Sequence, residues 1–594
     1  MRELRVRSLD GLPIHMPSTL RIGIDLGTTN SLVAVFESDG PRLIPNAHGA
    51  FLTPSVVGML ESGEIVVGEG ARELALTAPE RVVSSFKGWM GTDRAIEFAG
   101  KTYSATELSS IVLGALIRDV EAELGEAPTD VVITVPAYFN QHQRAATMQA
   151  AELAGLNVER IVNEPTAAAL TYGFHRRDED CRLVVFDLGG GTFDVTVMEI
   201  FDGTLEILGT AGESHLGGEN FTETLVGHAL RATGRSLEMA EMKEPLLVAR
   251  LRSEAERAKR SIGTDEVGRI RMADSDGIVP PDPMIIEVGA AEFEELVAPL
   301  LARLRRPTLR ALRDSSLTPG QIDQVLLVGG ATRMPVIRRL ATEIFARSPR
   351  ADVHPDEAVA LGASIQSALV ADDAAVDDIV LTDVCPHTLG VEIVKELGSR
   401  TVDGYFMPVV HRNTTIPVSR EKSVYTVHDG QTRLGLQIFQ GESRRIDDNL
   451  LLGELTITGL PPGPSGVEVI LRFTYDLNGL LEVEAIVPST GKRHTVVIKL
   501  AVSTLSDAEI EKAVERMQAL KFYPRENQGN QRLLAFASAA LKEVDPRRRD
   551  DLEGAVDRYE AWFQDNDLEQ FDAARQALIM TLSAVGLPYA GDDA

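Results

Sequence analysis

Hydrophobic positions along the chain change their spacing twice. From Arg21 to about Val370, apolar runs such as IGIDLG, DVVITVPAYF and QVLLVGGAT alternate with stretches such as AATMQAAELAGL, where apolar residues recur every three or four positions. The runs are typical of buried strands and the stretches of amphipathic helices. Strands that alternate with helices predict a layered α/β domain, assigned here to residues 20–370.

Past Cys385 the apolar residues follow a period of two in short runs, among them SVYTVHD, LGLQIFQGE and HTVVIKLAV. This alternation predicts an all-β domain over residues 385–503. Within it, the Asn-Gly pair of DLNGLLEVEA predicts a tight hairpin. Helical spacing returns in LSDAEIEKAVERMQAL, RRDDLEGAVDRYEAWF and DAARQALIMTLSAV, so residues 504–594 are expected to be helical.

Two further segments lack such periodicity. ADDAAVDD is small and acidic and has no apolar face; together with the following IVLTD it predicts a linker over residues 371–384. Residues 1–19 are interpreted as an N-terminal extension.

One strand–turn–strand pattern occurs twice. RIGIDLGTTNSLVAVF begins at Arg21, and LVVFDLGGGTFDVTVM begins at Leu183. Glycine lets a backbone approach a ligand closely, and exposed N–H groups and threonine hydroxyls bind anions. Two such hairpins facing each other would hold the phosphates of a nucleotide. The tip residues are Gly27, Thr28 and Thr29 in the first copy and Gly189, Gly190, Gly191 and Thr192 in the second.

The aspartates of these repeats, Asp25 and Asp187, come at the ends of their strands. Hydrated Mg²⁺ prefers one or two carboxylates together with phosphate oxygens, so both are candidates to hold the ion through water. Each turn alone could be an ordinary hairpin, in which Asp and Gly are common. The repetition favours the ligand site.

Two weaker signals accompany the hairpins. In VLLVGGATRMP, the amides of Gly329 and Gly330, with Arg333, could meet an α-phosphate or ribose at a helix N-terminus, or could form a plain strand-to-helix turn. In ERAKR, one helix face carries Glu256, Lys259 and Arg260, which could frame a base and ribose or be a solvated charged face. No GxxxxGK[ST] occurs, and neither hairpin opens a helix as a dinucleotide fingerprint requires.

The amino-acid composition excludes some classes of binding partner. The 594 residues carry 59 basic and 88 acidic side chains, a net charge of −29, which disfavours nucleic acid and anionic membrane surfaces. Only two cysteines occur, without a CxxC pair, which fits a reducing compartment and offers no zinc site. No long apolar window or signal peptide is evident, so a cytoplasmic protein is expected.

Seven longer motifs carry a resemblance. GIDLGTTNS, VITVPAYFN, VNEPTAAAL, DLGGGTFD, HLGGENF, VGGATRMP and HPDEAVALGA occur in the order seen in heat-shock chaperones of the DnaK type. The chain resembles this family strongly from Arg21 to about Val502 and weakly in its helical tail. The resemblance implies an actin-like, two-lobed ATPase, a linker, a β-sandwich that grips extended peptides and a helical lid.

The resemblance also implies function. ATP hydrolysis to ADP, with Mg²⁺ and K⁺, would control exchange of unfolded or specific client polypeptides, in a monomer assisted by a J-domain co-chaperone. The matching catalytic residues are Lys87, Glu164, Asp187 and Thr192. Additional nucleotide contacts are Asp194, Gly217, Gly218 and Asp356.

Three other groups of residues are assigned by the same resemblance. The relay from nucleotide to linker would consist of Pro136, Arg144 and Asp383. The residues expected to face a J-domain are Arg160, Asn163 and Thr166. The peptide cleft would be lined by Val394, Val427 and Leu434, which could equally be sandwich core.

Several positions depart from the family pattern. The segment between Lys87 and Tyr103 is shorter than the DnaK region that it matches, which puts dependence on a nucleotide exchange factor in doubt. Gly263 removes a hydroxyl from the adenine motif, and Thr382 replaces a linker leucine. Pro524 interrupts the lid. The short stretch before Tyr103 and the interrupted lid resemble the HscC branch of the family.

Two alternative functions are compatible with the two-lobed fold but do not include chaperone activity. A filament protein or sugar kinase would have no use for the 385–502 domain. An actin-like ATPase acting as a specialised regulatory or scaffold protein is countered by the complete set of catalytic residues.

Overall fold

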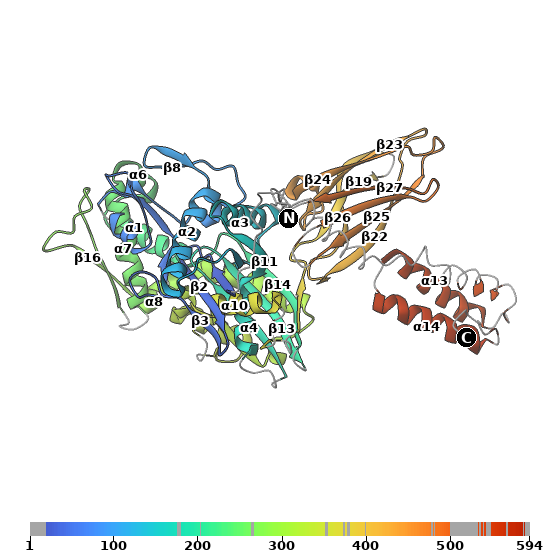
Figure 1. The fold of residues 1–594 in the computed structure, drawn as a ribbon, viewed down its shortest axis with the longest axis horizontal. Coiled ribbons are helices and arrows are strands. Elements are labelled where there is room, and N and C mark those ends of the chain that lie inside the picture. Colours follow the sequence, from blue (N-terminus) through green and yellow to red (C-terminus); the bar gives the residue numbers. More distant parts are fainter. Residues whose placement is uncertain are drawn as a thin grey trace, which may run out of the picture.

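The computed structural model describes residues 20–498 and 533–587 (Figure 1), with short gaps inside these ranges. The gaps are 76, 175–179, 202–203, 263–266, 351–353, 372, 374, 377–379, 398–399, 477–478, 480, 534–535, 538–539, 542–543, 545–547, 566–567 and 586. The N-terminal extension, Gly263 and Pro524 therefore lie outside the described residues.

The first lobe is built on a sheet in which β1 pairs with β10 in parallel and with β2 antiparallel. Its strands in spatial order are β11 (Asn157–Asn163), β10 (Asp130–Val135), β1 (Ile22–Asp25), β2 (Asn30–Glu37) and β3 (Gly40–Leu43), and β4 (Thr53–Pro54) also pairs with β2. Helices α2 (Ala105–Leu124) and α3 (Gln141–Leu153) cover this sheet with buried aliphatic side chains. Both helices begin with a capping box, which satisfies amides that the first turn leaves unpaired.

A smaller subdomain of the first lobe holds short elements around the segment that carries Lys87. They are β5 (Val56–Met59), β6 (Ile65–Val67), α1 (Glu69–Leu74), η1 (Pro79–Arg81), β7 (Val82–Ser84), η2 (Phe86–Trp89), β8 (Ile96–Phe98) and β9 (Lys101–Tyr103). The short segment between Lys87 and Tyr103 thus contains a single small hairpin, β8–β9.

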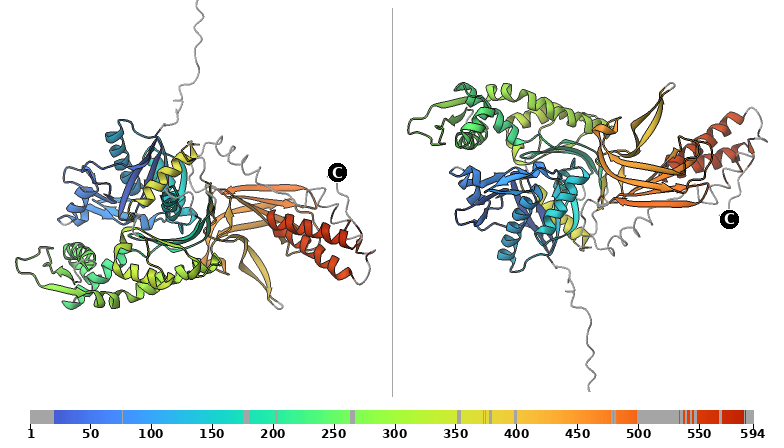
Figure 2. Two further views of the ribbon diagram at one scale, coloured as in Figure 1. Left: turned by 90° about the horizontal axis from the view of Figure 1, so that it is seen from below. Right: turned by 90° about the horizontal axis from the view of Figure 1, so that it is seen from above.

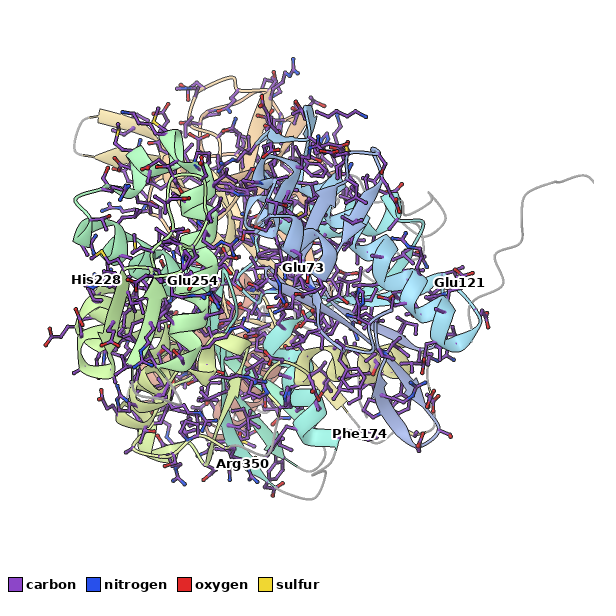
Figure 3. All side chains as sticks on the ribbon, turned by 90° about the vertical axis from the view of Figure 1, so that its left-hand side faces the viewer. Glu73, Glu121, Phe174, His228, Glu254 and Arg350 are labelled. Carbon is purple, nitrogen blue, oxygen red and sulfur yellow. The ribbon has the colours of Figure 1, made fainter. Side chains whose placement is uncertain are left out.

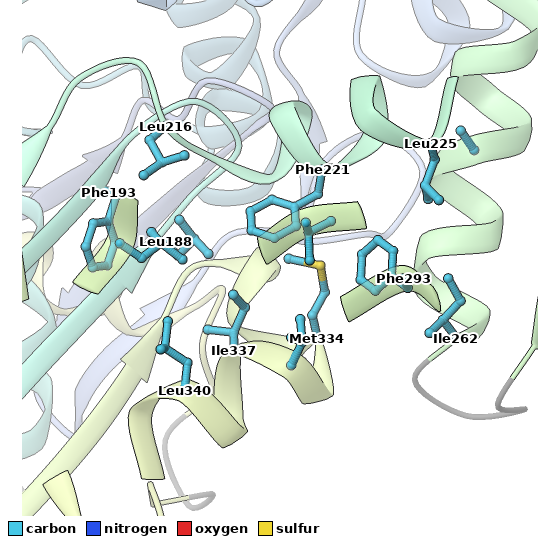
Figure 4. Packing of buried hydrophobic residues seen from close by; sticks show 14 of the residues in the cluster. Leu188, Phe193, Leu216, Phe221, Leu225, Ile262, Phe293, Met334, Ile337 and Leu340 are labelled. Carbon is cyan, nitrogen blue, oxygen red and sulfur yellow. The ribbon is translucent and has the colours of Figure 1, made fainter. Parts of the chain in front are cut away.

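The second lobe repeats the arrangement. Its sheet runs β17 (Gln324–Val328), β12 (Cys181–Leu188), β13 (Phe193–Phe201) and β14 (Thr204–Glu213). Its helices are α5 (Gly218–Ala232), α6 (Leu237–Lys243), α7 (Pro245–Ser261), α8 (Ala290–Asp314) and α9 (Pro335–Phe345), with β15 (Val267–Arg271), β16 (Ile285–Gly289), η3 (Pro319–Gln321) and η4 (Gly330–Arg333). Figure 4 shows their shared core, in which Phe193, Phe221 and Phe293 meet aliphatic side chains of α9.

Two helices join the lobes. α4 (Glu164–Phe174) packs on the second sheet and α10 (Ala358–Val370) on the first, and the two helices pack against each other. Gly362 allows this closeness, because a Cβ there would lie 1.7 Å from the carbonyl oxygen of Ala167. In Figure 2 the lobes, blue and green, lie side by side with α10 in yellow, and the orange sandwich lies at one end of both. Seen from the opposite end, Glu73 and Glu121 mark the first lobe and His228 and Glu254 the second (Figure 3).

The segment expected to be a linker is partly a strand. β18 (Val380–Val384) pairs in parallel with β14 of the second lobe and antiparallel with β21 (Thr415–Ile416) of the following domain. The second-lobe sheet is thereby extended into the β domain.

The all-β prediction is confirmed: two four-stranded antiparallel sheets pack into a sandwich. The first sheet is β20 (Arg400–Val410), β19 (Leu389–Leu397), β23 (Arg433–Gln440) and β24 (Leu450–Thr458), with η5 (Ile446–Asp448) before β24. The second is β22 (Val418–Tyr425), β25 (Glu468–Tyr475), β26 (Leu481–Val487) and β27 (Lys492–Ile498). The β25–β26 pairing confirms the hairpin predicted from Asn-Gly.

Helices end the chain as expected. α13 (Arg549–Asp565) and α14 (Leu568–Ala584) pack around Leu552, Tyr559 and Leu578. The predicted helix that begins near Leu505 lies outside the described residues. No helix in the described part of the chain is long and apolar enough to cross a membrane.

The α4–α10 contact gives a test of how the lobes are joined. We expect Gly362→Ala to lower the free energy of unfolding of the two-lobed domain by about 3 kcal/mol, since the methyl group would overlap backbone that cannot move alone. Thermal or urea unfolding measures the loss. Gly114→Ala in α2, where a Cβ finds only the end of Arg118, is the control and should be neutral or stabilising. Equal stability of both variants would contradict the packing.

Candidate functional site

The tips of the two repeated hairpins face each other. A Cβ on Gly190 would lie 1.8 Å from Thr29 Oγ1, and one on Gly191 would lie 3.0 Å from Thr28 Cγ2. Only glycine permits this approach of the second tip to the first. The β1–β2 and β12–β13 pairings place Asp25 and Asp187 at matching ends of their strands, as the repeat predicts.

The start of α5 supports the second tip. Gly218 N donates to Gly189 O at 2.9 Å, and Glu219 N donates to Gly190 O at 2.9 Å. A Cβ on Gly217 would lie 2.3 Å from the carbonyl carbon of Gly190, so glycine is needed here as well. The HLGGENF motif therefore fixes the position of the second tip.

Between the hairpins lies a cluster of carboxylates around one lysine. Lys87 is 3 % exposed, and its Nζ donates to Glu164 Oε1 at 2.8 Å. Burial, together with repulsion from Glu164, raises the pKa of Asp25 to about 7. The same two causes raise the pKa of Asp194 to about 7 and that of Asp187 well above its usual range. One lysine does not balance four buried carboxyl groups, so the cluster favours a further cation.

The cluster fits hydrated Mg²⁺ and a phosphate chain. No group of three or more His, Cys, Asp or Glu in the described residues is placed to ligate a metal directly. Binding through water is the mode that Mg²⁺ often retains. Asp194 Oδ1 is buried without a hydrogen-bond partner in the described structure, which leaves an acceptor for such a water. When bound, Mg²⁺ would neutralise phosphate charge while Lys87 and Glu164 orient the reacting groups.

The predicted base and ribose residues gather beside α5. Lys259 Nζ lies 2.6 Å from Glu256 Oε2 and donates to Gly218 O at 2.9 Å and to Thr222 Oγ1 at 3.0 Å. Arg260 Nε donates to Glu256 Oε1 at 2.9 Å. Burial opposes ionisation of Glu256, but the Lys259 ammonium outweighs it and lowers the pKa of Glu256 to about 2. Lys259 and Glu256 are thus joined to α5, whereas the Arg260 side chain is 66 % exposed.

The third glycine pair reaches the same cleft. A Cβ on Gly329, whose φ is 82°, would lie 2.3 Å from Leu188 O of the second hairpin. Arg333 Nη2 donates to Asp356 Oδ2 at 2.5 Å, and a Cβ on Gly330 would lie 2.9 Å from Asp356 Oδ1. The sequence-predicted nucleotide residues thus come together from both lobes.

One contact across the cleft was missed by sequence reasoning. Ser85 Oγ in the first lobe donates to Glu219 Oε1 in the second at 2.5 Å. Burial raises the pKa of Glu219. Ser85 has φ 57° directly before η2, which carries Lys87. The signal in the sequence is weak: a glutamate in the first turn of a helix beside two glycines.

The predicted relay forms a continuous hydrogen-bonded chain. Ala137 N, directly after Pro136, donates to Asp194 Oδ2 at 3.1 Å, and Ala137 O accepts from Arg144 Nη2 at 3.3 Å. Arg144 Nη2 also donates to Asn163 Oδ1 at 2.5 Å. Asn163 Nδ2 then lies 3.1 Å from both carboxylate oxygens of Asp383 in β18. The chain links the carboxylate cluster to the linker strand.

The three residues expected to face a J-domain co-chaperone do not form an exposed surface. Thr166 is fully buried in α4, and Asn163 is 5 % exposed and belongs to the relay, so neither side chain reaches the surface in this arrangement. Arg160 is half-buried near Asp383 and Asp476, and burial lowers its pKa. A J-domain contact through these three side chains stays a prediction.

The ATPase domain contacts the sandwich directly. Gln141 Nε2 at the start of α3 donates to Tyr475 Oη at 2.8 Å and to Gly479 O at 3.1 Å. Arg412 forms two hydrogen bonds to Asp314 at the end of α8, at 2.9 and 3.0 Å. The two domains therefore occupy a docked arrangement.

The predicted cleft residues fall into two groups. Val394 and Val427 are 38 % and 45 % exposed, so neither is sandwich core. Leu434 is half-buried and packs against the core of the sandwich.

Two lobes that close glycine hairpins over a carboxylate cluster, joined by a strand to a β-sandwich and a helical unit, define a nucleotide-hydrolysing protein with an appended binding domain. Residues 21–97 and 92–580 match the Hsp70 protein family, so the chain belongs to that family. It is an ATP-dependent chaperone that binds peptide substrates, and the fold class expected from the sequence is confirmed.

We expect Lys87→Ala to lower ATP turnover by about 100-fold or more, since no other described cation contacts Glu164 and a preorganised charge at the reacting phosphate is lost. Single-turnover hydrolysis measures the effect, and nucleotide affinity should change much less. Lys101→Ala on β9, exposed, is the control. Turnover equal to that of the natural chain would contradict the role of Lys87.

The Ser85–Glu219 contact generates a second prediction. Loss of this part-buried, charge-assisted hydrogen bond should speed ADP release about tenfold in Glu219→Gln and in Ser85→Ala. The double variant should release ADP no faster than either single variant, because each already breaks the same bond. Stopped-flow release of a fluorescent ADP measures the rates, and Ser84→Ala, exposed beside Ser85, is the control. Additive effects would show that the two residues act separately.

Proposed function

We propose that ATP binding favours the docked arrangement of this Hsp70 chaperone and that hydrolysis releases it, which switches the sandwich from fast peptide exchange to tight holding. The observation that carries this proposal is the hydrogen-bonded chain from Asp194 through Ala137, Arg144 and Asn163 to Asp383. A change in charge at the phosphate site would alter the partner of Ala137 N and so the hold on the linker strand. ATP acts by making contacts that differ between the two states.

The roles of individual site residues belong to the same proposal. Lys87 stabilises charge at the reacting phosphate, and Glu164 and Thr192 orient the attacking water. Asp25 and Asp187 hold Mg²⁺ through water, and K⁺ accompanies it. The tip glycines and the base triad hold ATP, and Gly329, Gly330, Arg333 and Asp356 contact its α-phosphate or ribose.

We also propose the unit boundaries 20–370, 371–384, 385–503 and 504–594, with 1–19 as an extension. The break after 370 is supported by the end of α10 at Val370. The small β8–β9 hairpin supports a place near the HscC branch and a reduced need for an exchange factor. The protein acts as a cytoplasmic monomer, with a J-domain co-chaperone as its activating partner.

Extended apolar segments of client proteins are proposed to bind along Val394, Val427 and Leu434. The exposure of the two valines supports this, since apolar side chains left uncovered in a sandwich are available to a ligand. An actin-like regulatory ATPase without a client has no use for them.

Limited proteolysis tests the docked arrangement. Thermolysin, which cleaves before Ile, Val and Leu, should cut before Val380 and Leu381 at least tenfold more slowly with ATP than with ADP, because both residues pair with β14 when β18 is docked. Asp383→Ala should abolish this protection by removing the partner of Asn163. Asp39→Ala, in an exposed turn, is the control. Equal cleavage with the two nucleotides would overturn the proposal.

A further inference from the structure

The β19–β20 hairpin carries a cluster of positively charged side chains to which the proposed chaperone function assigns no role. β20 is the outer strand of its sheet, and in Figure 2 the golden hairpin extends away from the orange strands. Ile393 pairs with Tyr405 and Lys395 with Val402, so the single Val394 of β19 lies opposite two residues of β20, Asp403 and Gly404, and the bulge is in β20. Val394, a proposed cleft residue, therefore lies opposite the bulge and directly before Lys395.

Three cations surround one ring on this hairpin. The Tyr405 ring centroid lies 4.8 Å from Arg445 Cζ, 5.3 Å from Lys395 Nζ and 5.3 Å from Arg444 Cζ. Tyr405 is 9 % exposed, so the cations cover the ring. Lys395 comes from β19, whereas the two arginines come from the connection between β23 and β24.

The backbone fixes part of this cluster. Arg445 Nη1 donates to Asp403 O at 2.9 Å, and Gly404, with φ 76°, leaves room for the guanidinium. Tyr405 forms a bridge with Arg445, and Phe406 N donates to Arg444 O at 3.0 Å. The arginines are therefore attached to the edge of β20.

The positive charge of the cluster is poorly compensated. Arg445 lies 3.9 Å from Asp447, whose carboxylate is largely exposed. In the described part of the chain, no ion pair or side-chain hydrogen bond is formed by Lys395 or Arg444. A ring face attracts each cation, but three like charges around one ring repel one another. An anion placed among them would remove the repulsion.

We propose that Lys395, Arg444 and Arg445 bind aspartate or glutamate side chains of the client polypeptide, next to the apolar residue at Val394. The inference rests on the proposed peptide cleft and adds a preference for acidic flanking residues. An extended polypeptide is favoured over a polyanion, because the chain carries a net charge of −29 and the exposed apolar side chain of Val394 directly precedes Lys395. Isolated carboxylates on an apolar segment suit this combination.

The test compares fluorescent peptides that share one apolar core and differ only in their flanks, with two glutamates in one and two glutamines in the other. Anisotropy with the full-length protein in ADP gives both dissociation constants. We expect the glutamate peptide to bind about fivefold more tightly at low salt, with the difference shrinking at high salt. Arg444→Gln and Lys395→Gln should each reduce the difference, and the double variant should abolish it.

The controls separate this proposal from the cleft itself. Lys492→Gln removes one charge from the exposed start of β27 on the other sheet and should preserve the preference. Equal affinity for the two peptides, or a preference that survives in the double variant, would overturn the acidic preference. Tight binding of an oligoglutamate that lacks the apolar core would overturn it too, since the cluster would then be a general anion surface. Failure of both core peptides to bind would instead reject the peptide cleft.

Discussion

The burial of four carboxyl groups around a single lysine is the constraint on which the rest of the structure depends. The four carboxyl groups come from both lobes, and burial makes the ionised forms of Asp25, Asp187 and Asp194 costly. A site of this kind is satisfied only when additional positive charge arrives. The lobes must therefore be held close enough to share the charge and yet be able to separate. Glycine tips in van der Waals contact, and one hydrogen bond between Ser85 and Glu219, meet both requirements.

The same cluster reaches the sandwich through backbone rather than through side-chain charge alone. Asp194 accepts from Ala137 N, and the loop that holds Ala137 leads directly into α3. The first residue of α3, Gln141, touches the sandwich, while Arg144 one turn later touches Asn163 and so the linker. One short segment thus senses the phosphate site at one end and two docking contacts at the other. Because all three contacts share this segment, a shift of the loop would disturb both docking contacts together.

Much of this could be predicted from the sequence, because local patterns carry it. The repeated hairpins follow from Asp, Gly and strand residues in fixed order, and the β-sandwich follows from period-two alternation. The features that could not be predicted depend on contacts between residues that lie far apart in the sequence. The burial of Thr166 and the clasp between Ser85 and Glu219, 134 positions apart, arise from how the lobes pack. The charge around Tyr405 was also invisible, since Lys395 and Arg444 come from separate hairpins and neither belongs to a motif.

The linker illustrates how a weaker contact can serve the switch. Thr382 replaces an apolar residue expected from the family resemblance, and its Oγ1 is buried without a hydrogen-bond partner in the described structure. Such a group costs about 1–3 kcal/mol. β18 nevertheless docks, because its backbone pairs with β14 and β21 and Asp383 meets Asn163. A docked state held by backbone pairing and one polar contact, and opposed by Thr382, lies closer in free energy to the undocked state. The differential contacts of ATP then need to supply less to move the population between them.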